Sequence, residues 1–85
     1  MKLEPEAFAD REVILVYIAR RLDDALRLEA ALTAAGFDYV VEADQYTGGV
    51  VFRTVRTGAF FYVLPENAAA ARDVIAKQGM KPLVE

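Results

Sequence analysis

In Val13-Ile14-Leu15-Val16-Tyr17-Ile18, and again in Ala59-Phe60-Phe61-Tyr62-Val63-Leu64, the chain runs through six apolar or aromatic residues in a row. Neither segment alternates apolar and polar residues, as a strand with one solvated face does. We therefore expect both segments to be strands of a small sheet whose two faces are both covered. Each is followed by a helix-like segment, and two helices can cover only one of these faces. The other face is predicted to need a partner.

The first helix is predicted from Leu22 to Ala35 by its amphipathic spacing. Asp23 is a candidate N-cap residue, and Asp24 places favourable charge in the first turn. Gly36 stands where a residue in the left-handed conformation commonly ends a helix. Phe37 follows it and is expected to pack back against the helix. The predicted inner stripe consists of Leu22, Ala25, Leu28, Leu32 and Ala35.

Between the first helix and the second apolar strand, the sequence predicts a projecting arm. Asp38–Ala43 alternates and is interpreted as an edge or near-edge strand, and Asp44–Gly49 as a turn because Gly-Gly permits positive φ. Val50–Leu64 is predicted to be one long bent strand with a bulge at Thr57-Gly58. A separate third hairpin is the alternative.

The second helix is expected after Pro65, with Glu66 or Asn67 as its cap and Gly79 at its end. Met80–Val84 carries a proline, so it is interpreted as an edge strand or a tail.

This order of elements is strand, helix, strand, strand, helix, strand. With right-handed crossovers it predicts a ferredoxin-like βαββαβ sandwich of the α+β class, with two helices on one face of a mainly antiparallel sheet. Strands one and three, the two apolar segments, would occupy its centre. Residues 12–85 are expected to form a single domain, and residues 1–11 a strap or leader.

Composition excludes several classes of site. The chain of 85 residues has no cysteine and no histidine, which excludes disulfides, thiolate metal sites and histidine-activated nucleophiles. We expect no enzyme, no cofactor and no metal. The net charge of −3 and the pI near 4.9 do not favour nucleic acid. The apolar runs are too short for a bilayer, and Met1–Glu6 is unlike a signal peptide, so a cytoplasmic protein is expected.

The sheet face away from the helices is predicted to be apolar. Its side chains would be the alternate residues Leu15, Tyr17, Phe60 and Tyr62, or the complementary set with Phe61. Soluble monomers rarely expose such a patch, so we expect it to pack against another copy in a dimer or ring. In the alternative, the N-terminal strap covers it with Leu3 and Phe8.

A ligand site is predicted around the Gly-Gly turn. Strands one and two should run parallel, which brings the basic residues after strand one to the same end as this turn. Guanidinium groups and turn N–H groups can hold a carboxylate or phosphate, although a plain structural turn is the alternative. The candidate residues are Arg20, Arg21, Tyr46, Thr47, Gly48, Gly49, Arg53 and Arg56.

Two acidic pairs are interpreted without a catalytic or metal role. Asp23 and Asp24 are explained by helix capping. Glu42 and Asp44 share a strand face, but no calcium-loop spacing follows them.

Much of the chain resembles small prokaryotic signal-transducing domains that are similar in fold to the nitrogen-regulatory PII group. The matching segments are Val13–Ile18, Leu22–Phe37, Tyr62–Asn67 and Ala71. The resemblance implies that the arm Tyr46–Gly58 corresponds to the loop with which PII-like proteins meet ligands and targets. No PII nucleotide-binding motif is present, so nucleotide binding is not carried over.

A second resemblance is to the RNA-recognition motif, in Val16-Tyr17-Ile18 and Thr57–Val63. It implies base stacking on strand aromatics, with Tyr17 and Phe61 on the open face. Ala59 stands where that motif has an aromatic residue, Val50–Arg56 adds length, and the chain is acidic.

The leading functional hypothesis is a non-enzymatic regulatory or interaction module that self-associates through its sheet. Its arm would meet a small anionic ligand or a protein target. Binding of single-stranded RNA is one alternative. Another is a small oligomeric enzyme that uses tyrosine, arginine or carboxylates in a pocket between the helices and the sheet.

Overall fold

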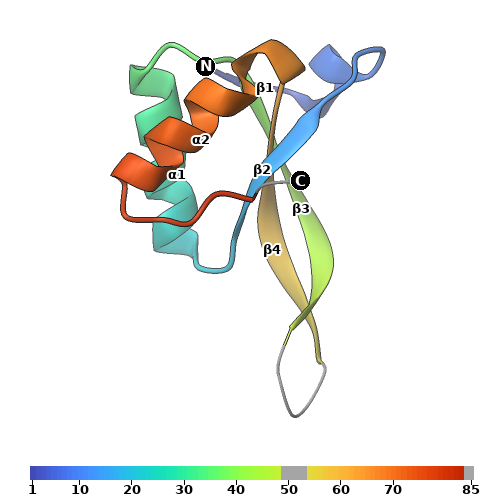
Figure 1. Ribbon diagram of the computed structural model, residues 1–85. Coiled ribbons are helices and arrows are strands. Elements are labelled where there is room, and N and C mark those ends of the chain that lie inside the picture. Colours follow the sequence, from blue (N-terminus) through green and yellow to red (C-terminus); the bar gives the residue numbers. More distant parts are fainter. Residues whose placement is uncertain (49–53, 84–85) are drawn as a thin grey trace.

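The computed structural model describes residues 1–48 and 54–83 of the chain (Figure 1). Each of the two apolar segments forms a strand that is followed by a helix, as predicted. The strands are β1 Lys2–Leu3, β2 Ile14–Ala19, β3 Tyr39–Gly48 and β4 Thr54–Val63. The helices are α1 Leu22–Ala34 and α2 Ala68–Lys77, and the short 3₁₀ helices are η1 Pro5–Phe8 and η2 Pro65–Asn67.

The four strands form one sheet in the order β1-β3-β4-β2, with both α-helices on the same side of it (Figure 1). β4 runs antiparallel to β3 and to β2, while β1 runs parallel to β3. β2 and β3 are therefore parallel to each other, as expected. The protein has a small α+β fold with a mixed sheet, and the ferredoxin-like strand order is not confirmed.

The prediction that β2 lies in the centre of the sheet is wrong. β3 and β4 occupy the centre, and β2 is an edge strand. Residues 80–83 form no strand, although the Leu83 N–H donates to the Val16 carbonyl oxygen at 2.8 Å. Pro82 has no N–H to give to a ladder, which explains why this segment lies along β2 without extending the sheet.

The main core lies between the helices and the sheet. Phe61 in β4 and Tyr39 in β3 stack with ring centroids 6.2 Å apart. The Tyr39 hydroxyl donates to the Glu29 carbonyl oxygen at 2.9 Å, so this buried phenol does not lack a partner. The cluster consists of Val16, Ala19, Ala25, Leu28, Leu32, Tyr39, Phe61, Val63, Ala68, Ala71, Ile75 and Met80.

Both helices end as their glycines predict. Gly36 and Gly79 have φ values of +84° and +78°, the left-handed conformation that favours glycine. The Phe37 N–H then donates to the Leu32 carbonyl oxygen at 3.1 Å, and the Met80 N–H to that of Ile75 at 3.3 Å. These are the hydrogen bonds of the Schellman motif.

The helix starts differ more from expectation. Arg21, not Asp23, occupies the N-cap position of α1, and no side chain caps this helix. Asp23 Oδ1 instead accepts the Asp24 N–H at 3.1 Å. Asn67 does occupy the N-cap position of α2, again without a side-chain cap hydrogen bond.

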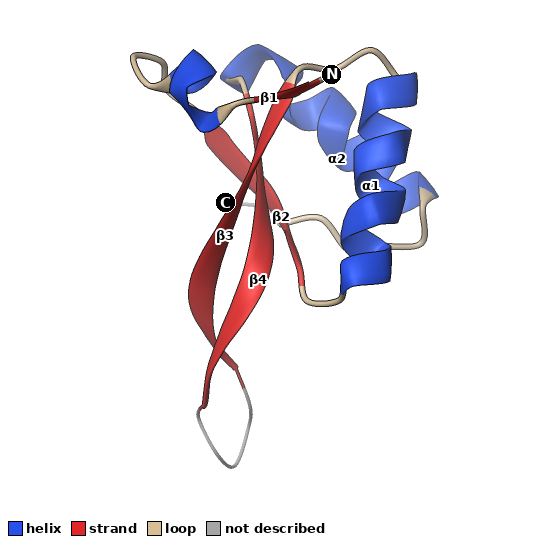
Figure 2. Cartoon of the chain, turned by 180° about the vertical axis from the view of Figure 1, so that it is seen from behind, coloured by secondary structure: helices blue, strands red, loops and turns tan. Residues whose placement is uncertain are grey.

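The arm is longer and more regular than predicted (Figure 2). Asp44–Gly48 continues β3 instead of turning, and it pairs with Thr54–Gly58 of β4 in unbroken register. No bulge occurs at Thr57-Gly58, so that prediction is wrong, while Thr54–Val63 is one strand as expected. Val50–Arg53 lies outside the described residues. Cross-strand hydrogen bonding, which local composition does not reveal, sets the length of this ribbon.

Candidate functional site

The sheet face opposite the helices differs from its predicted composition because β2 contains a bulge. The register shifts between Leu15 and Tyr17, so Tyr17 pairs with Phe61 and packs against the core cluster on the helix side. One extra residue moves the following side chains to the other face. Tyr17 therefore does not belong to the predicted open face. Cross-strand pairing assigns that face to Leu15, Ile18, Val40, Glu42, Phe60 and Tyr62.

Part of this open face is covered within the single chain. η1 lies across the sheet from the helices (Figure 1), and its Phe8 is only 9% exposed. Val40 and Phe60 are 3% and 9% exposed, although neither belongs to the main core cluster. These observations favour the alternative in which the N-terminal strap covers the face. Leu15, Ile18 and Tyr62 remain partly exposed, and self-association stays a prediction.

The aromatic platform implied by the RNA-recognition motif does not form. Phe61 is completely buried and stacks on Tyr39, so its ring has no face for a nucleobase. Tyr17 pairs with Phe61 on the same covered side of the sheet. The expectation that Tyr17 and Phe61 share an open face is therefore wrong.

A groove of about 670 Å³ lies at the end of the body from which the arm projects. It reaches around the outer edge of β2, because Tyr17 and Ile18 point to opposite faces of that strand and both line it. Three cations and one carboxylate line it, a formal charge of +3 − 1 = +2 in a chain of net charge −3. Its lining residues are Tyr17, Ile18, Arg20, Arg21, Asp24, Lys81, Pro82 and Leu83.

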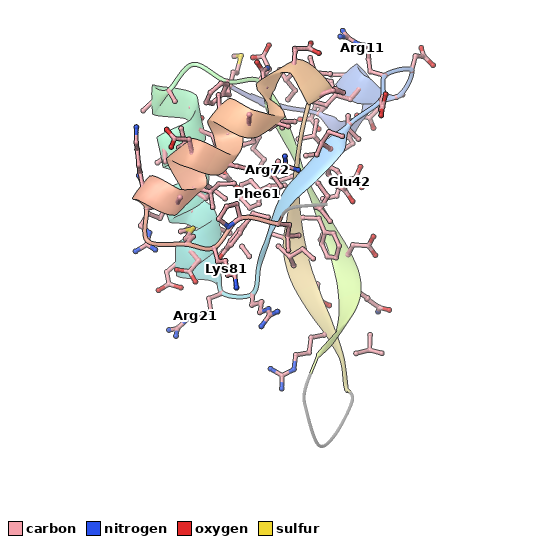
Figure 3. All side chains as sticks on the ribbon, viewed as in Figure 1. Arg11, Arg21, Glu42, Phe61, Arg72 and Lys81 are labelled. Carbon is pink, nitrogen blue, oxygen red and sulfur yellow. The ribbon has the colours of Figure 1, made fainter. Side chains whose placement is uncertain are left out.

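The groove is built from two distant parts of the chain. Arg20 and Arg21 follow the end of β2, and α1 begins directly after them. Lys81–Leu83 approaches from the other end of the chain. Figure 3 shows Arg21 and Lys81 on the helix side of the sheet and Glu42 on the opposite side. Two hydrogen bonds hold the backbone of Leu83. Its N–H donates to the Val16 carbonyl oxygen of β2, and Arg72 Nε of α2 donates to the Leu83 carbonyl oxygen at 2.9 Å.

The charges around the groove are partly paired. Arg21 Nε lies 3.5 Å from Asp23 Oδ1, and Arg27 Nη2 lies 3.5 Å from Asp24 Oδ1. Arg27 thus offsets the one carboxylate that lines the groove. Within residues 1–48 and 54–83, Lys81 forms no ion pair. The uncapped start of α1 adds the positive end of the helix dipole next to the groove.

The phenol groups of Tyr17 and Tyr62 both have a raised pKa. Burial is the main cause that raises the pKa of Tyr17, and the Asp24 carboxylate adds to it, while Arg20 and Arg27 oppose it. Burial, Glu42 and Asp44 raise the pKa of Tyr62 on the open face. At neutral pH the Tyr17 hydroxyl is therefore protonated and can donate a hydrogen bond into the groove.

The raised pKa of Tyr17 predicts a loss of stability in alkaline solution. Unfolded chains release the phenol proton near pH 10, whereas the folded chain holds it to higher pH. The folded state then binds more protons, so the free energy of unfolding falls above about pH 10 and is unaffected well below it. Urea unfolding at about pH 8 and about pH 11 measures this fall, which should be smaller in Tyr17→Phe. An equal fall in both proteins contradicts the prediction.

The structure brings only some of the predicted ligand residues together. Arg20 and Arg21 line the groove, while Arg56 is exposed on the arm opposite Tyr46 and does not line it. Tyr46, Thr47 and Gly48 continue β3, and Gly49 and Arg53 lie outside the described residues. Sequence reasoning missed the groove residues Tyr17, Ile18, Asp24, Lys81, Pro82 and Leu83. Lys81-Pro82 after the helix-ending glycine was the available signal, but nothing local relates it to β2.

The acidic residues form no metal centre in the part of the chain that is described. Glu42 and Asp44 are exposed on the sheet face opposite the helices, and neither lines the groove. Within residues 1–48 and 54–83, no three His, Cys, Asp or Glu side chains are placed to hold a metal ion. Among the described helices, none is both long enough and apolar enough to cross a bilayer.

No known protein family, curated protein or solved structure matches this chain. The resemblance to PII-like signalling domains therefore stays a prediction from sequence, and the groove must be interpreted from its own chemistry.

Proposed function

We propose that this protein is a non-enzymatic binding module for a small anionic ligand, and that the ligand occupies the groove between β2, the start of α1 and Lys81–Leu83. The observation that carries the proposal is the local charge of the groove. Its lining has a formal charge of +2 although the whole chain has a charge of −3. An acidic protein that gathers cations around one concavity attracts anions to that place.

The shape and donors of the groove support the same proposal. A volume of about 670 Å³ falls within the range of small-molecule sites, roughly 300–1,000 Å³. Guanidinium groups can bind a phosphate or carboxylate in a bidentate manner, and Lys81 adds a point charge. The neutral Tyr17 hydroxyl is a further donor. With no histidine or cysteine in the chain, these groups suit binding better than catalysis.

In the fold that we propose, the groove lies at the edge of the sheet where the last strand belongs. We propose a ferredoxin-like core in which β2, α1, β3, β4 and α2 follow the usual order. The parallel alignment of β2 and β3 on either side of β4 supports it. The segment after α2 then takes the place of the last strand beside β2, where Leu83 bonds to Val16. The groove lies where this irregular segment leaves the edge of β2 open.

The test is a titration of the native protein with inorganic phosphate, sulfate and acetate at pH 7 and constant ionic strength. At 100 times its Kd a ligand adds about 2.7 kcal/mol of stability, which raises the Tm of a domain this size by roughly 10–20 °C. We expect such a rise with at least one of these anions, and a smaller one in high salt. A Tm unchanged by all three anions contradicts the proposal.

Self-association through the open face is a second candidate. The observation that favours it is that Leu15, Ile18 and Tyr62 stay partly exposed beside the buried Phe60. The area available is smaller than predicted because Val40 and Phe60 are already buried within the single chain. Light scattering distinguishes a dimer or ring from a single 9.4 kDa chain. A monomer at high protein concentration rejects this candidate and leaves the groove proposal intact.

A further inference from the structure

We infer that the ligand of this groove is an amphiphilic organic anion, in which one phosphate or carboxylate group is joined to an apolar body about the size of a phenyl ring. This inference rests on the proposed function and adds the chemical class of the ligand.

Apolar side chains make up as much of the groove lining as charged ones. The phenol ring of Tyr17 and the side chains of Ile18, Pro82 and Leu83 share the cavity with its three cations. Leu83 is 39% exposed there, although two hydrogen bonds to its backbone hold it in place. A fully hydrated ion would leave this apolar surface in contact with water. An apolar group on the ligand would bury the surface, which is favourable.

The size of the groove supports the same inference. At about 30 Å³ per water molecule, 670 Å³ holds roughly twenty waters, far more than one inorganic anion displaces. Ligand sites in proteins are mostly apolar, with a few polar groups that fix the orientation. Here the cations and the Tyr17 hydroxyl would hold the anionic end, and the apolar residues would contact the rest of the ligand.

The arrangement of the C-terminal segment also fits an amphiphilic ligand. Lys81 and Leu83 come from the same three residues, so one short segment provides both a charge and an apolar side chain. Arg72 donates to the Leu83 carbonyl oxygen and does not line the groove. It therefore acts as a positioning residue for the apolar wall, and its guanidinium is not needed to contact the ligand.

The experiment compares three probes by calorimetric titration at pH 7: inorganic phosphate, phenyl phosphate and phenol. We expect phenyl phosphate to bind at least about tenfold more tightly than inorganic phosphate, which is about 1.4 kcal/mol. Phenol should bind weakly because it lacks the anion. In Leu83→Asn the ratio of the phenyl phosphate affinity to the inorganic phosphate affinity should fall toward one. Leu26→Asn is the matched control, because Leu26 is 56% exposed on α1 and does not line this groove.

The outcomes separate this inference from the proposed function. Equal affinity for phosphate and phenyl phosphate overturns the inference and leaves anion binding standing. Absence of binding by both anions overturns the two together. If Leu26→Asn reduces the preference as much as Leu83→Asn does, the apolar part of the ligand binds elsewhere and the inference is wrong. Amide NMR spectra of both variants establish that they are folded before the titrations are compared.

Discussion

Replacement of Phe61 by alanine is expected to remove about 3–5 kcal/mol of stability, the cost of deleting a buried phenylalanine. Phe61 is completely buried in the central strand β4 and stacks on Tyr39 beneath both helices. At 0.05–0.15 kcal/mol per residue, a chain of 85 residues has only about 4–13 kcal/mol in total. The variant should therefore lose a large share of its total stability, and urea denaturation followed by circular dichroism should show a much lower unfolding midpoint.

Two controls make the Phe61 result specific. Val55→Ala changes a residue of the same strand that is 65% exposed on the arm, and it should alter stability by less than about 0.5 kcal/mol. Phe60→Ala removes a side chain of the same size from the open face, where Phe60 is 9% exposed. We expect its cost to lie between the other two. A Phe61→Ala variant within about 1 kcal/mol of the native protein contradicts the fold described.

The second large effect concerns the charge of the groove. The double variant Arg20→Gln/Lys81→Gln lowers the formal charge of the groove from +2 to 0. Because hydrogen bonds to charged groups contribute roughly 1.5–3 kcal/mol each, anion affinity should fall by about 100-fold or more. Titration with the anion that binds the native protein measures the change. The remaining affinity should depend less on salt.

The matched control for this variant is Lys2→Gln/Lys77→Gln. Both double variants take the chain from −3 to −5, but Lys2 and Lys77 do not line the groove. Lys2 pairs with Glu29 at 3.4 Å and Lys77 with Asp73 at 3.1 Å, exposed pairs whose loss should cost less than about 1 kcal/mol each. If the control loses as much affinity as the groove variant, the effect is one of net charge and the groove is not the site.

Much of the local structure of this protein could be predicted from its sequence. Continuous apolar runs predicted both β2 and β4, because their residue types leave no solvated face. Gly36 and Gly79 predicted both helix ends, because a positive φ costs glycine least. In each case the physical cause lies within a few residues of the position concerned. The prediction failed at Asp23, because several nearby residues can occupy an N-cap position and tertiary packing chooses among them.

The candidate site could be predicted only in part. The sequence predicts Arg20 and Arg21 as ligand residues because parallel strands end at the same edge of a sheet, but it predicts them beside the turn of the arm. The structure joins them instead to Lys81, some sixty residues later in the chain. No pattern within either segment indicates that the two segments lie side by side. It arises because Arg72 and Val16 hold Leu83 beside β2.

The chain's own residues determined where β2, the apolar part of β4 and both α-helices form, where the helices end, and that no histidine or cysteine chemistry is available. Tertiary structure alone decided the bulge that turns Tyr17 toward the helices, the burial of Phe60 on the open face and the groove around Lys81. The physical reason is the range of the forces involved. Backbone sterics and apolar periodicity act between near neighbours, whereas register, coverage and concavity depend on contacts between segments far apart in the chain.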